Sequence, residues 1–352
     1  MILFLSKYPY TEEQFRDGFF QRVVDIDTYF ENDERIYLDV SLRKNMRNKA
    51  RETQNSMKKV YTCNIFLHFF FIIKLFSNAN FVYIHSLHNT LYSFLFIKWI
   101  KNKYVLDLHG VVPEELKFQN MKLKSKLFNL IECFIFDKID ICVAVTNRLA
   151  THYKNKYPVS KCKYIIYTIF PNNLVQSNLH ESSSDDNLVH IIYSGNTQKW
   201  QNIDLMLSVI KRNLFPNYKY TILTGELQNM KDALIIHGLN NEKNIELNSV
   251  SPKELASYYE RANYGFILRD DIAVNNVACP TKLVEYMFYG IIPIVYSDNI
   301  GDFRELKYER IHYTNLDDKL LNKKSFINHD IIQKLSRDNE FKLKEILMYN
   351  FN

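Results

Sequence analysis

The chain has 352 residues, of which 47% are hydrophobic and 14% aromatic, a composition that excludes an intrinsically disordered protein. Its length predicts two domains instead of one core. The net charge of +6 is modest, and the basic residues cluster locally without a known recognition motif, which argues against a nucleic-acid partner.

The five cysteines include no Cys-x-x-Cys pair. This pattern favours reduced thiols over a disulfide framework or a zinc site. The apolar run at the N-terminus, Met-Ile-Leu-Phe-Leu-Ser-Lys, is too short for a signal peptide and indicates a first strand instead. We therefore expect a cytoplasmic protein.

Strand-like and helical segments alternate along the first half of the chain. We expect strands at Ile2–Ser6, Ile36–Ser41, Phe81–His85, Tyr104–His109, Ile141–Val145 and Lys163–Ile169. Helices are expected near Gly18–Phe30, Cys63–Phe76, Thr90–Lys101 and Leu123–Lys138. Such alternation predicts a parallel sheet with helices on both faces.

The polar stretch Pro171–Asn187 predicts a linker. We place a first domain at residues 1–172, the linker at 173–187 and a second domain at 188–352. In the second domain we expect strands at His190–Ser194, Tyr218–Thr224, Ile245–Leu247, Tyr264–Arg269, Ile291–Tyr296 and Ile311–Tyr313. Helices are expected at Ile203–Lys211, Gln228–His237, Pro252–Arg261, Thr281–Tyr289 and Ile331–Met348. The sequence therefore predicts two doubly wound α/β domains. Sheets of this kind bind ligands at the carboxyl ends of their strands.

The segment Tyr104–Glu115 places His109 at the end of a buried strand, directly before Gly110. A neutral imidazole there can donate a hydrogen bond to a ligand hydroxyl. The alternative is a structural histidine at a strand end. Asp107, one pleat further inward, is interpreted as structural.

The second domain opens with a strand, the turn residue Gly195, the cation Lys199 and then a helix. This order is typical of phosphate-binding turns, since glycine allows a close approach of the backbone. Many α/β turns share it, so a solvent-exposed Lys199 remains the competing interpretation.

The most informative stretch is residues 280–296. Pro280 suits a first helical turn and Gly290 suits the position after the last turn. Lys282 and Glu285 are three residues apart, so a helix places them on one face near its N-terminus. That end of a helix attracts phosphate, and Glu285 can accept hydrogen bonds from sugar hydroxyls. The alternative is an ordinary amphipathic helix with a solvated Lys–Glu pair.

The pattern Pro-x-Lys-x-x-Glu-Tyr-x-x-x-Gly-x-x-Pro-x-Val resembles the donor-site segment of GT-B glycosyltransferases of the family 4 type. The resemblance implies two Rossmann-like domains with a cleft between them. It implies that the donor diphosphate faces Thr281 and Lys282, and that Glu285 binds the ribose. The segment from Gly195 through Lys199 to Asp204 resembles the family's diphosphate-binding turn.

Two departures from the family pattern affect the expected site. Asn196 stands where the family often has an arginine, so Lys199 must carry the charge. Val277 stands where the family has the first of two glutamates, eight residues before Glu285. We therefore expect Asp271, or the neighbouring asparagines, to contact the donor sugar in place of that glutamate.

The resemblance implies a retaining glycosyltransferase that uses a nucleotide-diphosphate sugar, and we expect it to act on a glycan of the cell surface such as capsule, O-antigen or exopolysaccharide. His109, Lys199 and Lys282 are the expected catalytic residues. We expect no metal and no further cofactor, because basic side chains and a helix terminus can neutralise the diphosphate. The alternative is a catalytically silent GT-B subunit that binds or activates a partner. The two departures favour it slightly, and Lys282, Glu285, His109 and Lys199 together argue against it.

Acceptor binding is assigned by topology to the first loop, with Arg16 and Gly18. The basic segment Arg43–Lys59 and the apolar run Ile65–Phe76 predict peripheral contact with the anionic inner face of a membrane, where a lipid-linked acceptor is found. The alternative for this segment is a solvated loop.

Overall fold

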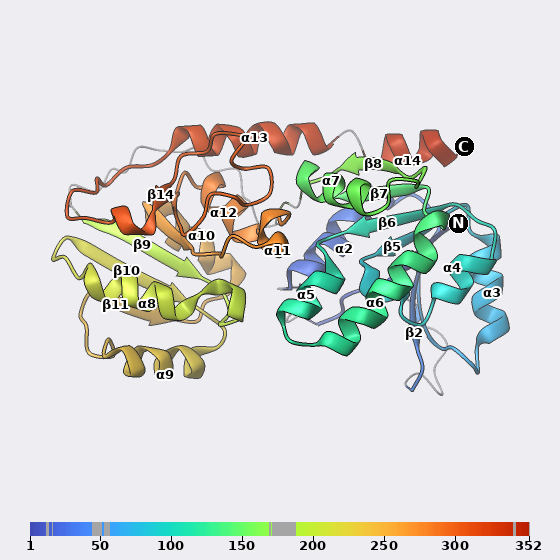
Figure 1. Ribbon diagram of the computed structural model, residues 1–352, viewed down its shortest axis with the longest axis horizontal. Coiled ribbons are helices and arrows are strands. Elements are labelled where there is room, and N and C mark those ends of the chain that lie inside the picture. Colours follow the sequence, from blue (N-terminus) through green and yellow to red (C-terminus); the bar gives the residue numbers. More distant parts are fainter. Residues whose placement is uncertain are drawn as a thin grey trace. The chain divides into compact units, whose positions relative to one another are not determined.

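The computed structural model describes residues 1–11, 14–15, 17–43, 51–52, 57–168, 170, 188–340 and 343–351. The chain forms two compact units, Met1–Ile169 together with Asp338–Asn352, and Phe170–Arg337 (Figure 1). The C-terminal residues thus belong with the first unit and not, as expected, with 188–352. The reason is apolar burial, because Leu343 and Leu347 lie in the core of the first unit. The expected linker, 173–187, lies outside the described residues.

The first unit is a doubly wound sheet in the order β3-β4-β2-β1-β5-β6-β7-β8, within the described residues. All pairs are parallel except β3 with β4. Its strands are β1 (Ile2–Leu5), β2 (Arg35–Ser41), β3 (Arg51–Glu52), β4 (Lys58–Asn64), β5 (Val82–His85), β6 (Tyr104–Leu108), β7 (Ile141–Ala144) and β8 (Lys163–Ile166). Its helices are α2 (Gly18–Thr28), α3 (Phe69–Asn78), α4 (Phe94–Trp99), α5 (Val112–Phe118), α6 (Lys122–Ile135), α7 (Asn147–Lys156) and α14 (Leu343–Phe351).

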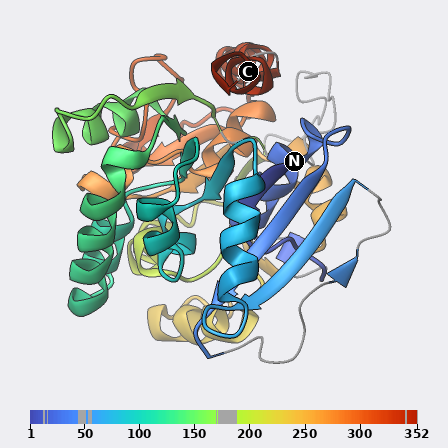
Figure 2. The same ribbon diagram turned by 90° about the vertical axis from the view of Figure 1, so that its right-hand side faces the viewer.

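The segment expected as one helix, Cys63–Phe76, is wrong at its start. Cys63 lies in β4, which pairs along the whole of β2, side by side with it in Figure 2. The Asn64 side chain then accepts hydrogen bonds from the N–H groups of Phe66 and Leu67, at 3.0 and 3.3 Å. This local turn separates the strand from α3, because the side-chain carbonyl competes for N–H groups that a helix would use.

The second unit has strand order β11-β10-β9-β12-β13-β14, and all its pairs are parallel. Its strands are β9 (Val189–Ser194), β10 (Tyr218–Leu223), β11 (Ile245–Asn248), β12 (Tyr264–Ile267), β13 (Ile292–Val295) and β14 (Ile311–His312). Its helices are α8 (Ile203–Arg212), α9 (Leu227–His237), α10 (Pro252–Arg261), α11 (Ala273–Asn276), α12 (Thr281–Phe288) and the first part of α13 (Phe326–Glu340).

The strand order of each unit reverses direction once, between β1 and β5 in the first unit and between β9 and β12 in the second. Loops after these strands diverge there, which leaves room for a ligand at the carboxyl edge. The expected helix Ile331–Met348 is in fact two helices, α13 and α14, because the chain passes from the second unit back to the first. Among the described residues, no helix is both long and apolar enough to cross a membrane.

Candidate active site

In the second unit, helix α12 follows the loop after β12 and carries the two residues that the sequence placed on one helical face. Pro280 precedes the helix as its N-cap. Gly290 ends it with a φ of 65°, and its N–H donates to the Met287 carbonyl at 3.0 Å. The Ile291 N–H donates to the Tyr286 carbonyl at 2.8 Å, which completes a Schellman motif. The predicted helix, glycine stop and strand are therefore confirmed.

Lys282 lies in the first turn of α12, beside the turn after β9. A Cβ atom at position 195 would collide with the Lys282 ammonium group, so Gly195, with a φ of 155°, makes room for it. The Lys282 Nζ lies 5.4 Å from the centre of the Tyr193 ring, an attractive cation–π distance. The sequence pattern thus brings Gly195 and Lys282 together, although they are far apart in the chain.

The charge of Lys282 is not balanced inside the protein. Within the described residues, no ion pair joins its ammonium group to a carboxylate. Burial, and secondarily the positive charge of Arg269, lowers the pKa of Lys282 to about 8, and Glu285 opposes this only in part. A lysine in this state gains free energy when an anion binds beside it.

Glu285 lies one turn further along α12 and is held by tyrosines. Its Oε2 accepts a hydrogen bond from the Tyr259 hydroxyl at 2.8 Å, and Tyr259 lies 2.6 Å from the Ser194 hydroxyl. The Tyr286 hydroxyl accepts from the Ser194 N–H at 3.0 Å. Burial raises the pKa of Glu285, against the opposing effects of Tyr259 and Lys282. Within the described residues its Oε1 accepts no hydrogen bond, so this oxygen can receive one from a ligand hydroxyl.

The other predicted donor residues occupy the same edge of the sheet. Thr281 is the first residue of α12, and Asn196 follows Gly195, with its carbonyl accepting from the Tyr193 hydroxyl at 2.5 Å. Lys199 begins a short 3₁₀ helix, Lys199–Gln201, and its side chain is exposed. The structure therefore supports Lys282 as the embedded cation of this edge, with Lys199 further out in solvent.

The loop after β12 contains Asp271 and Val277. The Asp271 carboxylate accepts from the amide groups of Asn276 and Asn299 at 2.8 and 2.9 Å, so it ties the loop together. Val277 is buried. The amide of Asn275 donates to the Asp270 carbonyl at 2.9 Å, while its buried Oδ1 has no hydrogen-bond partner in the described part of the chain. A contact of this loop with a sugar stays a prediction.

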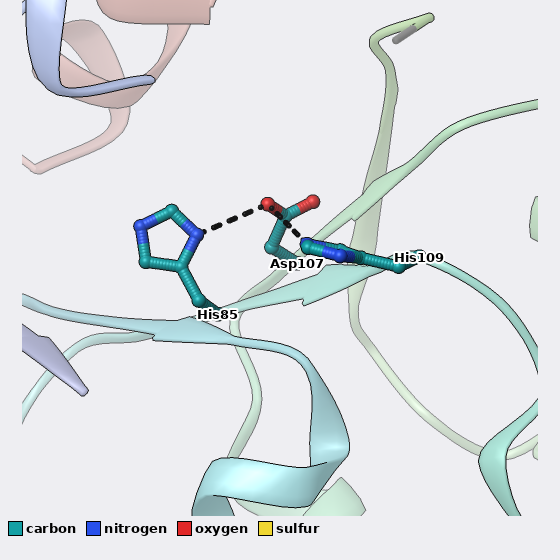
Figure 3. A group of neighbouring side chains, drawn as sticks. All are labelled: His85, Asp107 and His109. Atoms are coloured by element: carbon teal, nitrogen blue, oxygen red, sulfur yellow. Dashed lines mark hydrogen bonds and ion pairs between the residues drawn. The ribbon is translucent and has the colours of Figure 1, made fainter. Parts of the chain in front are cut away.

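In the first unit, a histidine pair and a carboxylate gather at the carboxyl ends of β5 and β6 (Figure 3). The Nε2 of His109 lies 3.1 Å from Oδ2 of Asp107, and the Nδ1 of His85 lies 3.5 Å from the same oxygen. His85 and Asp107 are fully buried, whereas the His109 side chain keeps 16% of its surface exposed. His109 is thus the accessible member of the group.

Asp107 is the anchor of this cluster, and not merely an inward-facing strand residue. Arg22 of α2, also fully buried, donates to both its oxygens, from Nε at 2.9 Å and from Nη2 at 2.7 Å. Burial by itself opposes the charge of this carboxyl group. The Arg22 guanidinium and His109 overcome that effect and hold the pKa of Asp107 well below its usual range. Burial lowers the pKa of His85, which keeps that imidazole neutral.

Asp107, His85 and His109 could each offer one ligand atom to a metal ion, and these atoms lie within 4.8 Å of one another. Arg22 already occupies both carboxylate oxygens, and a guanidinium at 2.7 Å would repel a cation. The donor set therefore does not fit a metal ion, and we derive no reaction step through one. Gly18, predicted on the acceptor side, is the first residue of α2, while Arg16 lies outside the described residues.

Comparison with known proteins adds to this geometry. No family model matches the sequence, and no curated protein matches it. Solved structures do match over nearly the whole chain. A trehalose-phosphate synthase (UDP-forming) of Burkholderia vietnamiensis has a TM-score of 0.66 at 10% identity, covering 99% of this chain and 96% of that one. HepE of Anabaena, in complex with UDP, has a TM-score of 0.63 at 11% identity and covers 99% of both chains.

A third similar structure is the lipopolysaccharide outer core galactosyltransferase WaaB, with a TM-score of 0.62 at 12% identity over 99% of this chain and 98% of that one. These proteins are glycosyltransferases built from two such sheets. The chain has the GT-B fold. This confirms the predicted fold class, and identities this low establish the fold alone.

The contacts that hold Asp107 in the first unit and Glu285 in the second were not predicted. Arg22 and His85 contact Asp107, and Tyr259 holds Glu285. Their partners are 22 to 85 positions away in the chain, so no local spacing reveals them. A usable signal for Arg22 was present, since an arginine on the apolar face of α2 requires a buried anion.

Proposed function

We propose that this protein is a glycosyltransferase that moves a sugar from a nucleotide-diphosphate sugar to a glycan acceptor. The observation that carries the proposal is Lys282 at the first turn of α12, an embedded cation that forms no ion pair within the described part of the chain. Backbone N–H groups at a helix N-terminus bind phosphate, and Lys282 adds the matching charge. HepE, similar in fold, has been solved with UDP and with UDP-glucose, which supports a nucleotide sugar as the ligand.

The proposed chemistry follows from the charge that develops on the donor. When the bond between sugar and diphosphate breaks, negative charge grows on the leaving diphosphate. Lys282 and the N-terminus of α12 stabilise that charge, with Lys199 as a second cation nearer solvent. Glu285 accepts hydrogen bonds from the ribose hydroxyls through its Oε1, while Tyr259 keeps the carboxylate in position.

His109 is the candidate for the contact with the transferred sugar. Asp107 orients its imidazole through Nε2, so that the other ring nitrogen can face a ligand. The resemblance to family 4 transferases supports retention of configuration by front-face substitution. No carboxylate of the described residues is placed as a covalent nucleophile, which agrees with that mechanism.

The biological setting that we propose is the synthesis of a surface polysaccharide such as capsule, O-antigen or exopolysaccharide, on a lipid-linked acceptor at the cytoplasmic face of the membrane. The likeness to WaaB, whose name includes the lipopolysaccharide outer core, supports this setting. The sequence segment first assigned to membrane contact, Arg43–Lys59, lies largely outside the described residues.

The experiment is a panel of UDP-, GDP- and other nucleotide sugars incubated with the purified protein, followed by chromatography of free nucleoside diphosphate. We expect release from one donor class, and loss of that release in Lys282→Met. A protein that binds a nucleotide sugar but releases no diphosphate from any donor or acceptor extract would be a silent subunit. A protein that binds none of the panel would contradict a donor site at α12.

A further inference from the structure

Helix α6 of the first unit has apolar side chains on both its inner and its outer face. Its inner face buries Phe128, Ile131 and Ile135 against the unit. Its outer face exposes a second row of apolar side chains to solvent. These are Leu123, Leu127, Leu130 and Phe134, with 84%, 46%, 67% and 37% of their surfaces exposed.

The spacing of the exposed row is helical. Its members are separated by four, three and four positions, so they form one continuous stripe along the helix. A contiguous apolar stripe on a surface helix marks a binding surface more often than scattered exposed leucines do. Figure 1 shows α6 next to α4 and α5 in the first unit, so the stripe belongs to a helical layer that is well supported from behind.

The charges around the N-terminal part of the stripe have one sign, while at its C-terminal end the exposed Asp137 is paired with Lys98 at 2.8 Å. Lys122, Lys124 and Lys126 are all exposed on the first turns of α6. The acidic residue of this helix, Glu132, is fully buried and pairs with Lys156 at 2.6 Å. The sequence has no aspartate or glutamate between Leu116 and Ile131. The outer face of α6 is therefore apolar and cationic, a combination that complements an anionic lipid surface.

The neighbouring helix layer has the same character. The sequence between Met57 and Leu106 contains no acidic residue. Phe96 of α4 packs against Phe69 of α3 with ring centres 5.5 Å apart, and Phe70 of α3 is 84% exposed. The exposed residues of α3 belong to the apolar run that the sequence analysis assigned to a membrane surface.

We propose that the outer face of α6 docks this protein on an anionic phospholipid bilayer, with the leucine stripe in the interface and the three lysines at the headgroups. This proposal identifies the surface through which the protein contacts the membrane. It rests on the proposed function only because a lipid-linked acceptor is the reason for the protein to bind a membrane. Binding to lipid itself requires neither donor nor acceptor, so the two proposals can fail separately.

The test uses the full-length protein and vesicles of two compositions, phosphatidylcholine alone and phosphatidylcholine mixed with phosphatidylglycerol. We expect co-sedimentation with the anionic vesicles that weakens at high NaCl concentration. The triple variant Lys122→Gln, Lys124→Gln, Lys126→Gln should bind these vesicles about a hundredfold more weakly, because each lysine contributes about 1 kcal/mol near such a surface. The double variant Leu127→Ser, Leu130→Ser should bind the anionic vesicles more than about tenfold more weakly.

The matched control lies in the second unit, where α9 exposes Ile235 and Ile236 at 59% and 81%. In that helix the one lysine, Lys231, is followed directly by Asp232, so Ile235→Ser with Ile236→Ser should leave vesicle binding unchanged. Thermal unfolding verifies that each variant is folded. The α6 variants should keep wild-type affinity for nucleotide in solution, whereas Lys282→Met should keep vesicle binding.

Three outcomes overturn the proposal. In the first, the protein binds neither type of vesicle. In the second, it binds neutral and anionic vesicles equally. In the third, it self-associates in analytical ultracentrifugation, and Leu127→Ser with Leu130→Ser abolishes that association without any lipid binding. The last result would make the stripe an interface between two copies of the chain.

Discussion

Both units place a carboxylate at the carboxyl edge of a parallel sheet, Asp107 fully buried and Glu285 partly exposed, and the two carboxylates have opposite surroundings. In the first unit, Asp107 has a buried arginine on both oxygens, and its pKa is held well below the usual range. In the second unit, Glu285 accepts a hydrogen bond from Tyr259 and is attracted by Lys282 without forming an ion pair among the described residues, and burial raises its pKa. The neighbouring Lys282 is shifted in the opposite direction, to about 8.

This comparison distinguishes charged groups that stabilise the fold from charged groups that are available to bind a ligand. The counter-ion of Asp107 is part of the chain, so this pair is complete before anything binds. Lys282 and Glu285 are each desolvated, and the contacts of each with the described residues compensate for this only in part. Such a cost in free energy is tolerated where a bound molecule supplies the missing charge or hydrogen bonds. The following variants test this contrast.

The largest effect is expected on stability in the first unit. Arg22→Met removes the cation from a fully buried ion pair and leaves Asp107 without it. Losing one partner of such a pair costs about 3–5 kcal/mol, because the remaining charge stays desolvated. The measurement is the free energy of unfolding from urea titration. The control is Lys98→Met, which breaks the partly exposed pair with Asp137 and should cost no more than about 1 kcal/mol. Similar losses for both variants would refute the role assigned to Arg22.

The next effect is expected on turnover in the second unit. Lys282→Met should lower kcat about a hundredfold or more, since one preorganised group facing the developing charge contributes about 3–4 kcal/mol. The fold should survive, because methionine needs no counter-ion. Lys199→Met is the matched control and should lower kcat less, as Lys199 lies in solvent. Steady-state kinetics with the active donor gives both values, and a larger loss in Lys199→Met would reverse the assignment of the principal cation.

A smaller effect is expected on donor binding. Glu285→Ala should weaken nucleotide affinity by roughly 1.5–3 kcal/mol, the range for hydrogen bonds to a charged group. Calorimetric titration with the nucleoside diphosphate measures it, and Tyr259→Phe should lose less because the carboxylate remains. If the folded Glu285→Ala variant bound nucleotide as tightly as the wild type, Glu285 would have no part in the donor site.

The last effect concerns the pH dependence of stability. The folded-state pKa of Lys282, about 8, lies below the ordinary value of 10.5. Between these pH values the unfolded chain binds more protons than the folded one, so the wild type gains stability as the pH rises. The destabilisation from Lys282 is fully present below pH 8 and is relieved toward pH 10.5. Lys282→Met should therefore be more stable than the wild type at pH 7, and the two unfolding free energies should converge as the pH increases. A difference independent of pH would show that Lys282 is not desolvated.

The sequence by itself was sufficient for the fold class of both units. The alternation of strand and helix predicted two doubly wound sheets, and the order Pro280, Lys282, Glu285, Gly290 predicted a helix with its stop and the following strand. These features depend on spacing over a few residues, because a helix relates positions three and four apart and a strand alternates every second one.

Only the tertiary structure decided which distant groups meet. Arg22 reaches Asp107 across 85 positions, and Tyr259 reaches Glu285 across 26. In the tertiary structure, α14 also belongs to the first unit. Cys63 lies in a strand, since pairing with β2 outweighed the local helical pattern. The physical reason is the same in each case: burial of charge and pairing of strands are satisfied between segments remote in sequence, and local periodicity contains no information about their partners.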